Sequence, residues 1–292
     1  MSDHHGRFVW YELLTTDVAS AKAFYGKVLG WGAQDASTVD LAYHQFTIGK
    51  VPVGGLMDLP PDARRMGASP RWIGYVGVDD VDAVADRIVR LDGAVYVPPT
   101  NTNIGRISVV ADPQTATLAL VTGLKPGEQP AEPDEPGRVG WHELLASDWK
   151  KAFAFYSELF GWRKADAEFG STDRYQMFSV GQQTIGGMFT KRPMEPIPFW
   201  LYYFNVDDVD LAAERVTAAG GQIFEGPIEL PDGSWIARCR DAEGTAFALQ
   251  GNRSQDAIDR APASELGWSA QWDGYSSQGR LLINKPRSKG SK

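Results

Sequence analysis

Two glutamates are the residues of this sequence whose surroundings point most directly to chemistry. Glu12 lies in "VWYELL" and Glu143 in "GWHELL", so each follows a tryptophan by two residues and precedes a leucine by two. Because side chains alternate along a strand, these three residues would share one face of a strand. A carboxylate on such an apolar face needs a hydrogen-bonding partner or a raised pKa.

A carboxylate in this setting has a functional and a structural interpretation. In the functional one, Glu12 or Glu143 acts as a general base, or it anchors a cationic or hydroxyl-bearing ligand. In the structural one, the carboxylate is hydrogen bonded to the backbone of a neighbouring loop or to an arginine. The presence of the glutamate at both positions favours the structural interpretation, and the sequence leaves both open.

Both glutamates lie in a long internal repeat. Residues 10–31 and 141–162 are identical at 11 of 22 positions with a constant offset of 131. Residues 70–82 and 198–210 are identical at eight of 13 positions. A period near 130 residues is the size of a whole domain, much longer than a solenoid unit. The chain of 292 residues is therefore expected to contain two copies of one domain.

The boundaries of the two copies follow from composition. The segment "GLKPGEQPAEPDEPGR" between them is rich in proline and acidic residues and cannot bury a core, so it is typical of a linker. We expect a first domain at residues 1–123, the linker at 124–138, a second domain at 139–250 and a C-terminal extension at 251–292.

Each copy shows the same order of expected elements. A strand around Trp10 leads to Asp17, a good N-cap, and to a helix that Gly30 ends. Three strand-like pieces follow, and the order restarts with a strand at Trp72 and a helix capped by Asp80. Each half thus contains two β-α-β-β-β units. The four units begin near Trp10, Trp72, Trp141 and Trp200.

Composition excludes several classes of protein. The net charge is −8, and there is no basic stripe that could bind nucleic acid. The sequence also contains no run of 18 apolar residues, so we expect no membrane span. The N-terminus does not resemble a secretory signal. The single cysteine, Cys239, excludes an intrachain disulfide framework. We expect a cytoplasmic protein with neither nucleic acid nor membrane as a partner.

The ordered motifs "D…AFY…LGW", "W..Y..VDDVD" and "DPQ…LAL" resemble the vicinal oxygen chelate superfamily of glyoxalases, bleomycin-resistance proteins and extradiol dioxygenases. The resemblance covers about residues 8–122 and 139–250 and is greatest to a tandem, glyoxalase-like or hydroxylase-labelled subgroup that includes a mycobacterial antigen. It implies an α+β fold of two tandem domains. Each domain would be two βαβββ units that form a curved mixed sheet with helices outside.

The resemblance also implies where a metal would be held in each half. Metal-binding members carry His or Gln, then His, then Glu, at three positions on the concave face of the sheet. Trp10, Ile73 and Ala119 occupy these positions in the first half, and Trp141, Leu201 and Ala248 occupy them in the second. Because none of these side chains supplies a metal ligand, we expect no metal and no other cofactor.

The remaining residues of the concave face follow from alternation along the strands. We expect the ligand-binding residues to be Trp10, Glu12, Tyr43, Gln45 and Tyr75 in the first half, and Trp141, Glu143, Tyr175, Tyr203 and Asn205 in the second. Such a face is aromatic with a few polar groups, which is typical of a small-molecule site.

Two functions are compatible with these residues. The first is metal-free binding of an aromatic or polycyclic small molecule, as in bleomycin-resistance proteins. The alternative is a metal-independent enzyme, hydroxylase-like or isomerase-like, in which Glu12 or Glu143 is the catalytic base. The small molecule is the expected partner. The chain is expected to be a monomer with pseudo-twofold halves, or a weak homodimer.

Overall fold

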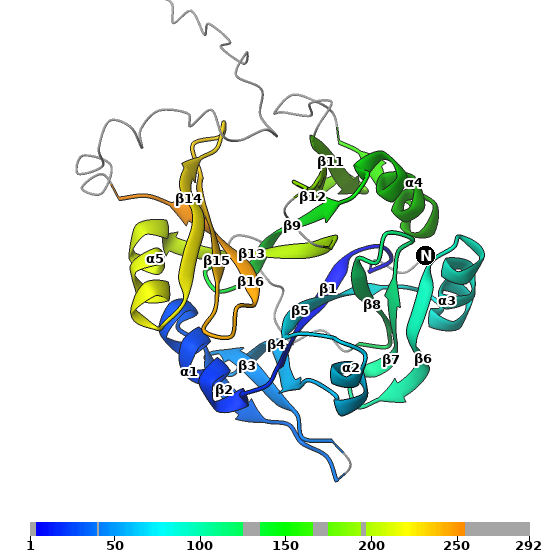
Figure 1. Ribbon diagram of the computed structural model, residues 1–292, viewed down its shortest axis with the longest axis horizontal. Coiled ribbons are helices and arrows are strands. Elements are labelled where there is room, and N and C mark those ends of the chain that lie inside the picture. The colour runs from blue at the N-terminus through cyan, green and yellow to red at the C-terminus, as the bar shows by residue number, and fades with distance from the viewer. Residues whose placement is uncertain (1–3, 40, 125–134, 166–174, 194–196, 255–292) are drawn as a thin grey trace, which may run out of the picture.

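The computed structural model describes residues 4–39, 41–124, 135–165, 175–193 and 197–254 (Figure 1). Residues 125–134 of the expected linker and residues 255–292 of the expected extension lie outside the described residues. No helix in the described ranges is both long and apolar enough to span a membrane.

The first half is built from two β-α-β-β-β units with a short helix between them. The first unit and that helix comprise β1 (Phe8–Thr15), α1 (Val18–Leu29), β2 (Gly32–Asp35), β3 (His44–Ile48), β4 (Val51–Asp58) and α2 (Pro61–Arg65). The second unit comprises β5 (Arg71–Gly77), α3 (Val81–Arg90), β6 (Ala94–Thr102), β7 (Gly105–Ala111) and β8 (Thr117–Thr122).

The second half repeats the arrangement. Its first unit comprises β9 (Val139–Ala146), α4 (Trp149–Phe160), β10 (Arg163–Lys164), β11 (Tyr175–Val180) and β12 (Gln183–Thr190). Its second unit comprises β13 (Phe199–Asp208), α5 (Val209–Ala218), β14 (Gln222–Glu229), β15 (Trp235–Arg240) and β16 (Ala246–Asn252). The predicted α+β fold of four such units is confirmed.

Aspartates start the helices as their sequence positions predict. The Asp17 carboxylate accepts a hydrogen bond from the Ser20 amide at the start of α1, and Asp80 accepts one from the Ala83 amide at the start of α3. Gly30 ends α1 in the left-handed conformation, with φ of 72°, which a residue without Cβ adopts freely. These local signals fix where each helix begins and where α1 ends.

Each half forms one mixed sheet of eight strands in the same order. The first sheet runs β2-β3-β4-β1-β5-β8-β7-β6 and the second runs β10-β11-β12-β9-β13-β16-β15-β14. In both, the two central strands, β1 with β5 and β9 with β13, are antiparallel, so the two units of a half meet side by side. Each sheet curves, and one face becomes concave (Figure 1).

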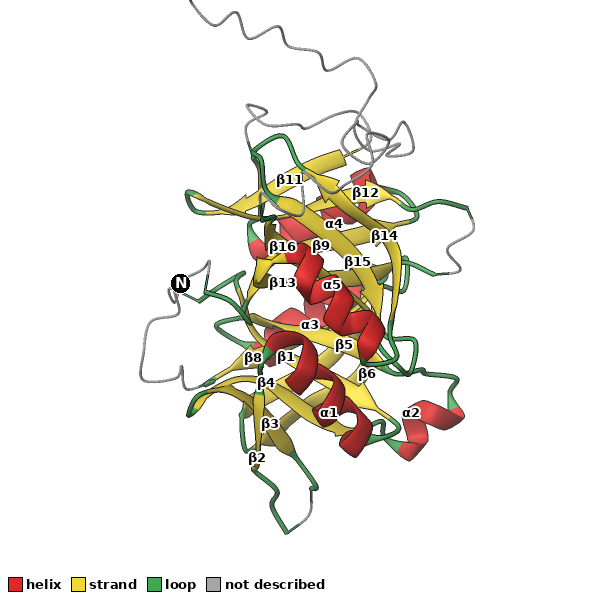
Figure 2. Cartoon of the chain, turned by 90° about the vertical axis from the view of Figure 1, so that its left-hand side faces the viewer, coloured by secondary structure: helices red, strands yellow, loops and turns green. Residues whose placement is uncertain are grey.

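The two sheets pack back to back through their convex faces. α1 lies beside α5 on one side of the molecule, and α3 lies near α4 on the other (Figures 1 and 2). One continuous apolar core joins the halves and includes Leu13, Tyr25, Trp162 and Phe247. Burial of this shared surface is the main force that holds the halves together.

Hydrogen bonds across the core repeat in pairs. The Trp31 indole N–H donates to the Gly137 carbonyl at 3.0 Å, and the equivalent Trp162 donates to the Gly6 carbonyl at 2.7 Å. Likewise the Tyr25 hydroxyl donates to Asp241 at 3.1 Å and the Tyr156 hydroxyl to Asp112 at 3.2 Å. Each bond joins one half to the other and has a counterpart in the reverse direction, which is the mark of a pseudo-twofold interface.

His142 lies in this interface. Its Nδ1 is 2.6 Å from the Ile185 carbonyl, which can only accept, so Nδ1 carries the proton and Nε2 accepts from the Tyr11 hydroxyl at 2.6 Å. The ring also stacks on Phe8 at a centroid distance of 4.2 Å. Burial lowers the pKa of His142 from 6.5 to about 4. Tyr11 and His142 hold equivalent positions, so the repeat brings them together.

Candidate functional site

The three positions implied for metal ligands do meet on the concave face of each half. Trp10, Ile73 and Ala119 belong to one apolar cluster. In the second half Leu201 and Ala248 are packed together, with Trp141 against them. The described residues contain no group of three or more His, Cys, Asp or Glu side chains placed to hold a metal ion. These donor sets do not fit a divalent metal, which needs several N, O or S ligands.

Glu12 is the polar centre of the concave face in the first half. It lies on β1 opposite Ile73 of β5, and its side chain is 5% exposed. The Tyr75 hydroxyl donates to its Oε1 at 3.0 Å, and the Tyr43 hydroxyl also donates to it. The Trp10 indole N–H in turn donates to Tyr43 Oη at 3.2 Å. Three aromatic residues therefore direct a chain of neutral donors toward one carboxylate.

The electrostatic setting of Glu12 is set by burial. Desolvation raises the pKa of Glu12, and the hydrogen bonds from Tyr43 and Tyr75 act in the opposite direction without cancelling it. Among the described residues Glu12 has no ion-pair partner. A carboxylate in this state is a stronger base than an exposed one, and it can accept from a ligand donor.

Glycines make room for the tyrosines beside both glutamates. A Cβ on Gly55 of β4 would overlap the Tyr43 hydroxyl and lie 3.0 Å from Glu12 Oε2. A Cβ on Gly187 of β12 would overlap the Tyr175 hydroxyl in the same way. The second glycine of each pair in "VGGLM" and "IGGMF" is therefore needed for the close approach of the phenol to the sheet.

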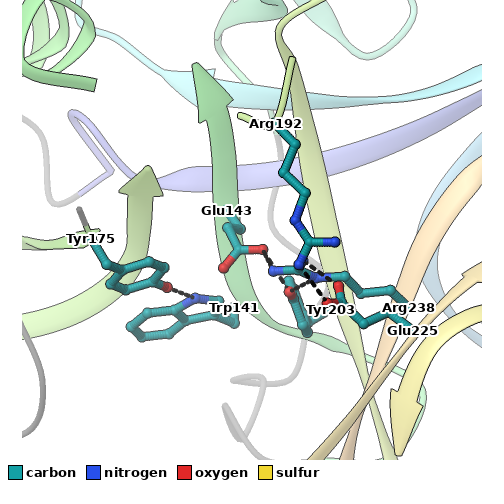
Figure 3. Close-up of polar contacts among 7 residues, drawn as sticks. All are labelled: Trp141, Glu143, Tyr175, Arg192, Tyr203, Glu225 and Arg238. Carbon is teal, nitrogen blue, oxygen red and sulfur yellow. Dashed lines mark hydrogen bonds and ion pairs between the residues drawn. The ribbon is translucent and has the colours of Figure 1, made fainter. Parts of the chain in front are cut away.

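Glu143 occupies the matching place in the second half but has different partners (Figure 3). It is 1% exposed, and the Tyr203 hydroxyl donates to its Oε2 at 2.6 Å. Arg238 Nη2 of β15 donates to the same oxygen at 2.6 Å, and Arg238 Nε donates to Tyr203 Oη at 2.9 Å. The Trp141 indole donates to Tyr175 Oη at 3.1 Å, as its counterpart does in the first half.

The ion pair extends outward from Glu143. Arg238 Nη1 donates to Glu225 Oε2 at 2.7 Å, and Glu225 also lies 3.3 Å from Arg192 (Figure 3). The Arg238 guanidinium also lies over the Phe189 ring at 5.5 Å. Burial acts to lower the pKa of Arg238, but Glu143, Tyr203 and Glu225 together raise it well above its ordinary value. Arg238 is therefore permanently charged and neutralises Glu143.

Arg238 and Glu225 were not among the residues expected from the sequence. The available signal is "WIARCR", where Arg238 falls between Ala237 and Cys239 in a strand whose other positions are mostly buried. In the first half Val109 holds the same place, because both residues pair with the alanine of the last strand, Ala248 or Ala119. Comparison of the two copies shows that Arg238 is charged where the first copy has an apolar residue, but it does not show which residue Arg238 pairs with.

The ten expected residues fall into two compact groups and two outliers. The groups are Trp10, Glu12, Tyr43 and Tyr75 in the first half, and Trp141, Glu143, Tyr175 and Tyr203 in the second. Gln45 lies toward the sheet edge and accepts a hydrogen bond from Gln34 at 2.8 Å. Asn205, within β13, is hydrogen bonded to Gln250 at 2.6 Å and to the Glu135 carbonyl at 3.5 Å.

Comparison with protein families connects this geometry to known proteins. The family model described as Glyoxalase/Bleomycin resistance protein/Dioxygenase superfamily matches residues 7–120 and 138–249. A Mycobacterium bovis protein named "Putative glyoxylase CFP32" is 33% identical over 244 residues, which are 82% of this chain and 92% of that protein. The anthracycline biosynthesis protein DauV of Streptomyces sp. (strain C5) is 28% identical over 262 residues, 84% of this chain and 92% of that protein.

Solved structures match in fold at low identity. The Mn(II)-bound glyoxalase from Novosphingobium aromaticivorans aligns with a TM-score of 0.60 and 13% identity, over 94% of this chain and 93% of that one. The 2,3-dioxygenase LapB from Pseudomonas sp. KL28 aligns with a TM-score of 0.58 and 11% identity, over 88% and 95% of the two chains. At these identities the matches establish the fold, and they carry no assignment of metal or substrate.

Proposed function

Because this chain belongs to the Glyoxalase/Bleomycin resistance protein/Dioxygenase superfamily, we propose that it binds an aromatic or polycyclic small molecule on the concave faces of its sheets, without a divalent metal. Membership supports a glyoxalase-like or dioxygenase-like protein. The proposal is narrower, since it assigns the ligand class and removes the metal from the site.

The observation that carries the proposal is the chemistry of the positions implied for metal ligands. In the first half they are Trp10, Ile73 and Ala119, which are buried against one another. An apolar, aromatic surface with one carboxylate at its centre favours a planar ligand held by ring contacts and oriented by a few polar groups.

The curated relatives support the ligand class. DauV and a second Streptomyces protein, DnrV of Streptomyces peucetius, are both named as anthracycline biosynthesis proteins, and anthracyclines are polycyclic aromatic compounds. DauV aligns with 84% of this chain, so its similarity spans both halves. A polycyclic ligand also has the flat faces that Trp10 and Trp141 would contact.

Calorimetric titration with 9-anthracenemethanol tests the proposal directly. We expect the full-length protein to bind this three-ring probe, and to bind it equally in EDTA and in MnCl2. Benzyl alcohol, which has the same hydroxymethyl group on one ring, should bind much more weakly because it buries less apolar surface. Absence of probe binding would overturn the ligand class. Binding that EDTA abolishes and Mn(II) restores would overturn the metal-free site.

A metal-independent enzyme is the second candidate, and the state of Glu12 favours it. Burial raises the pKa of Glu12, so the carboxylate is suited to take a proton from a substrate. The two tyrosine hydroxyls that donate to it can adjust their hydrogen bonds when it does so. Glu143 is less suited to act as a base, because Arg238 is bonded to the same carboxylate oxygen as Tyr203.

Turnover separates the two candidates. An enzyme should convert many equivalents of a hydroxylated polycyclic substrate, and Glu12→Gln should abolish conversion while the protein stays folded. Glu143→Gln should retain turnover, provided that the variant folds. A binding protein should saturate at a fixed stoichiometry and return the compound unchanged, as judged by mass spectrometry.

A further inference from the structure

The two concave faces differ at one pair of matching positions. Arg238 pairs with Ala248 and Glu225 on its neighbouring strands, and Val109 pairs with Ala119 and Val97 in the first half. Two valines therefore stand where the second half has the partly buried ion pair of Arg238 and Glu225. In the second half Arg238 is the only ion-pair partner of Glu143 among the residues the structure describes. The first half has Val109 at that position, so Glu12 lacks such a partner among those residues.

Each glutamate accepts a hydrogen bond from an equivalent tyrosine despite this difference. Tyr75 donates to Glu12 at 3.0 Å, and Tyr203 donates to Glu143 at 2.6 Å. Glu12 keeps 5% of its surface exposed, while Glu143 keeps 1%. Both residues are buried, and Glu12, which lacks a counter-charge, is the less completely buried of the two.

Arg71 is the nearest basic residue on the central strands of the first half, and it is committed elsewhere. It lies on β5 opposite Leu14, and its Nε donates to the Ser69 carbonyl at 3.0 Å. Phe199 holds the equivalent position in the second half, opposite Leu145. The first half therefore offers a carboxylate without a counter-charge on an aromatic face, and a positive charge is the group that would complete it.

We infer that the first half holds the working site and that it selects a planar aromatic ligand carrying a protonated amine, which pairs with Glu12 while its rings lie along the aromatic face. The inference rests on the proposed function, because it assigns that binding to one half and adds the charge of the ligand. The second half then serves as a closed counterpart, since Arg238 occupies the place that the ligand cation takes in the first.

Three anthracene probes that differ only in the group on carbon 9 test the charge requirement: 9-anthracenemethylamine, 9-anthracenemethanol and 9-anthracenecarboxylate. At pH 7.5 they carry positive, zero and negative charge. We expect wild-type protein to bind the amine at least about tenfold more tightly than the alcohol, and the carboxylate more weakly than either. Glu12→Gln should weaken amine binding by about tenfold and change alcohol binding less than about twofold.

Three further variants locate the site and protect the test from folding effects. Val109→Arg installs the arginine of the second half, and we expect it to remove the preference for the amine. Gly55→Ala pushes Tyr43 away from Glu12 and should weaken amine binding. The matched Gly187→Ala acts on Tyr175 in the other half and should leave amine binding unchanged. Circular dichroism of each variant establishes that it is folded.

The outcomes distinguish this inference from the function beneath it. Protein that binds none of the three probes contradicts the proposed function itself. Equal affinity for amine and alcohol, or no effect of Glu12→Gln, contradicts the charge requirement and leaves the proposed function standing. Loss of amine binding in Gly187→Ala but not in Gly55→Ala places the site in the second half and overturns the assignment to the first.

Discussion

The two halves share a backbone, a sheet order and a central glutamate, yet they solve the problem of a buried carboxylate differently. In the first half Glu12 is held by the neutral donors Tyr43 and Tyr75, and burial raises its pKa. In the second half Glu143 is paired with Arg238, which extends to Glu225. A duplicated fold can therefore keep one polar position and add or omit its counter-charge through a residue on a different strand.

The comparison teaches that a residue present in both copies can have a different role in each. Glu143 fits the structural interpretation, in which an arginine satisfies the carboxylate. Glu12 fits the functional one better, because its only partners in the described residues are two phenols that a ligand can complement. The predictions below test that contrast and the symmetry around it.

The largest effect is expected from removing the cation of the second half. Arg238→Met leaves Glu143 buried without a counter-charge, and we expect the free energy of unfolding to fall by about 3–5 kcal/mol. Arg240→Met makes the same change at an exposed position of the same strand and should cost no more than about 0.5 kcal/mol. Urea denaturation of both variants measures the difference. Similar losses in the two would contradict a dominant role for the buried ion pair.

His142 is expected to make the whole interface acid-sensitive. Its folded pKa of about 4 lies below the ordinary 6.5, so its stabilising contribution is complete above pH 6.5 and is lost as the pH falls through 6.5 toward 4. A shift of this size corresponds to about 3 kcal/mol. His142→Gln should remove that part of the pH dependence in denaturation curves taken between pH 4 and 7.5.

His44→Gln is the matched control for the histidine experiment. His44 is half-buried, and glutamine already stands at the equivalent position, Gln176. We expect this variant to keep the wild-type dependence of stability on pH. If His44→Gln and His142→Gln flatten the pH profile equally, the interface histidine is not its source.

Removing the charge of each glutamate should give a smaller difference in stability between the two halves. At pH 7 Glu143→Gln should lower the free energy of unfolding by about 1–3 kcal/mol, because it weakens a charged hydrogen bond to Arg238. Glu12→Gln should change it by no more than about 1 kcal/mol, since its partners are neutral. Thermal and urea denaturation measure both, and a larger loss at Glu12 would reverse the contrast.

The pH dependence of Glu12→Gln has a definite sign. The folded pKa of Glu12 is raised, so wild-type protein loses stability as the pH rises from the ordinary glutamate pKa through the folded one. Glutamine does not ionise, so the variant escapes that loss. The stability of Glu12→Gln relative to wild type should therefore increase from pH 4 to pH 8. A constant difference across this range would show that Glu12 titrates as an exposed glutamate does.

The smallest effects are expected where the halves are alike. Tyr25→Phe and Tyr156→Phe each remove a hydroxyl that donates to an aspartate of the other half, Asp241 or Asp112. Each should cost about 1 kcal/mol, and the two costs should agree to within about 0.5 kcal/mol. Denaturation of the single variants and the double variant tests both statements. Costs that differ several-fold would show that the pseudo-twofold symmetry does not extend to energetics.

The sequence by itself determined the elements of this protein and their repetition. Aspartates such as Asp17, glycines such as Gly30 and the alternation around Glu12 act within a few residues, so they can be interpreted without knowledge of the fold. The offset between the copies then predicts that the same units occur twice. The family resemblance supplied the concave face, and alternation placed the two groups of aromatic and acidic residues on it.

The tertiary structure alone decided which partners those residues have. Arg238 lies 95 positions after Glu143 and meets it only because the fold places β15 in the same sheet as β9, with β13 and β16 between them. His142 likewise makes two hydrogen bonds between the two sheets, and one of its partners, Tyr11, comes from the other half, 131 positions away. Local patterns report which face a side chain occupies, whereas its charge balance depends on contacts that chain folding brings together from distant positions.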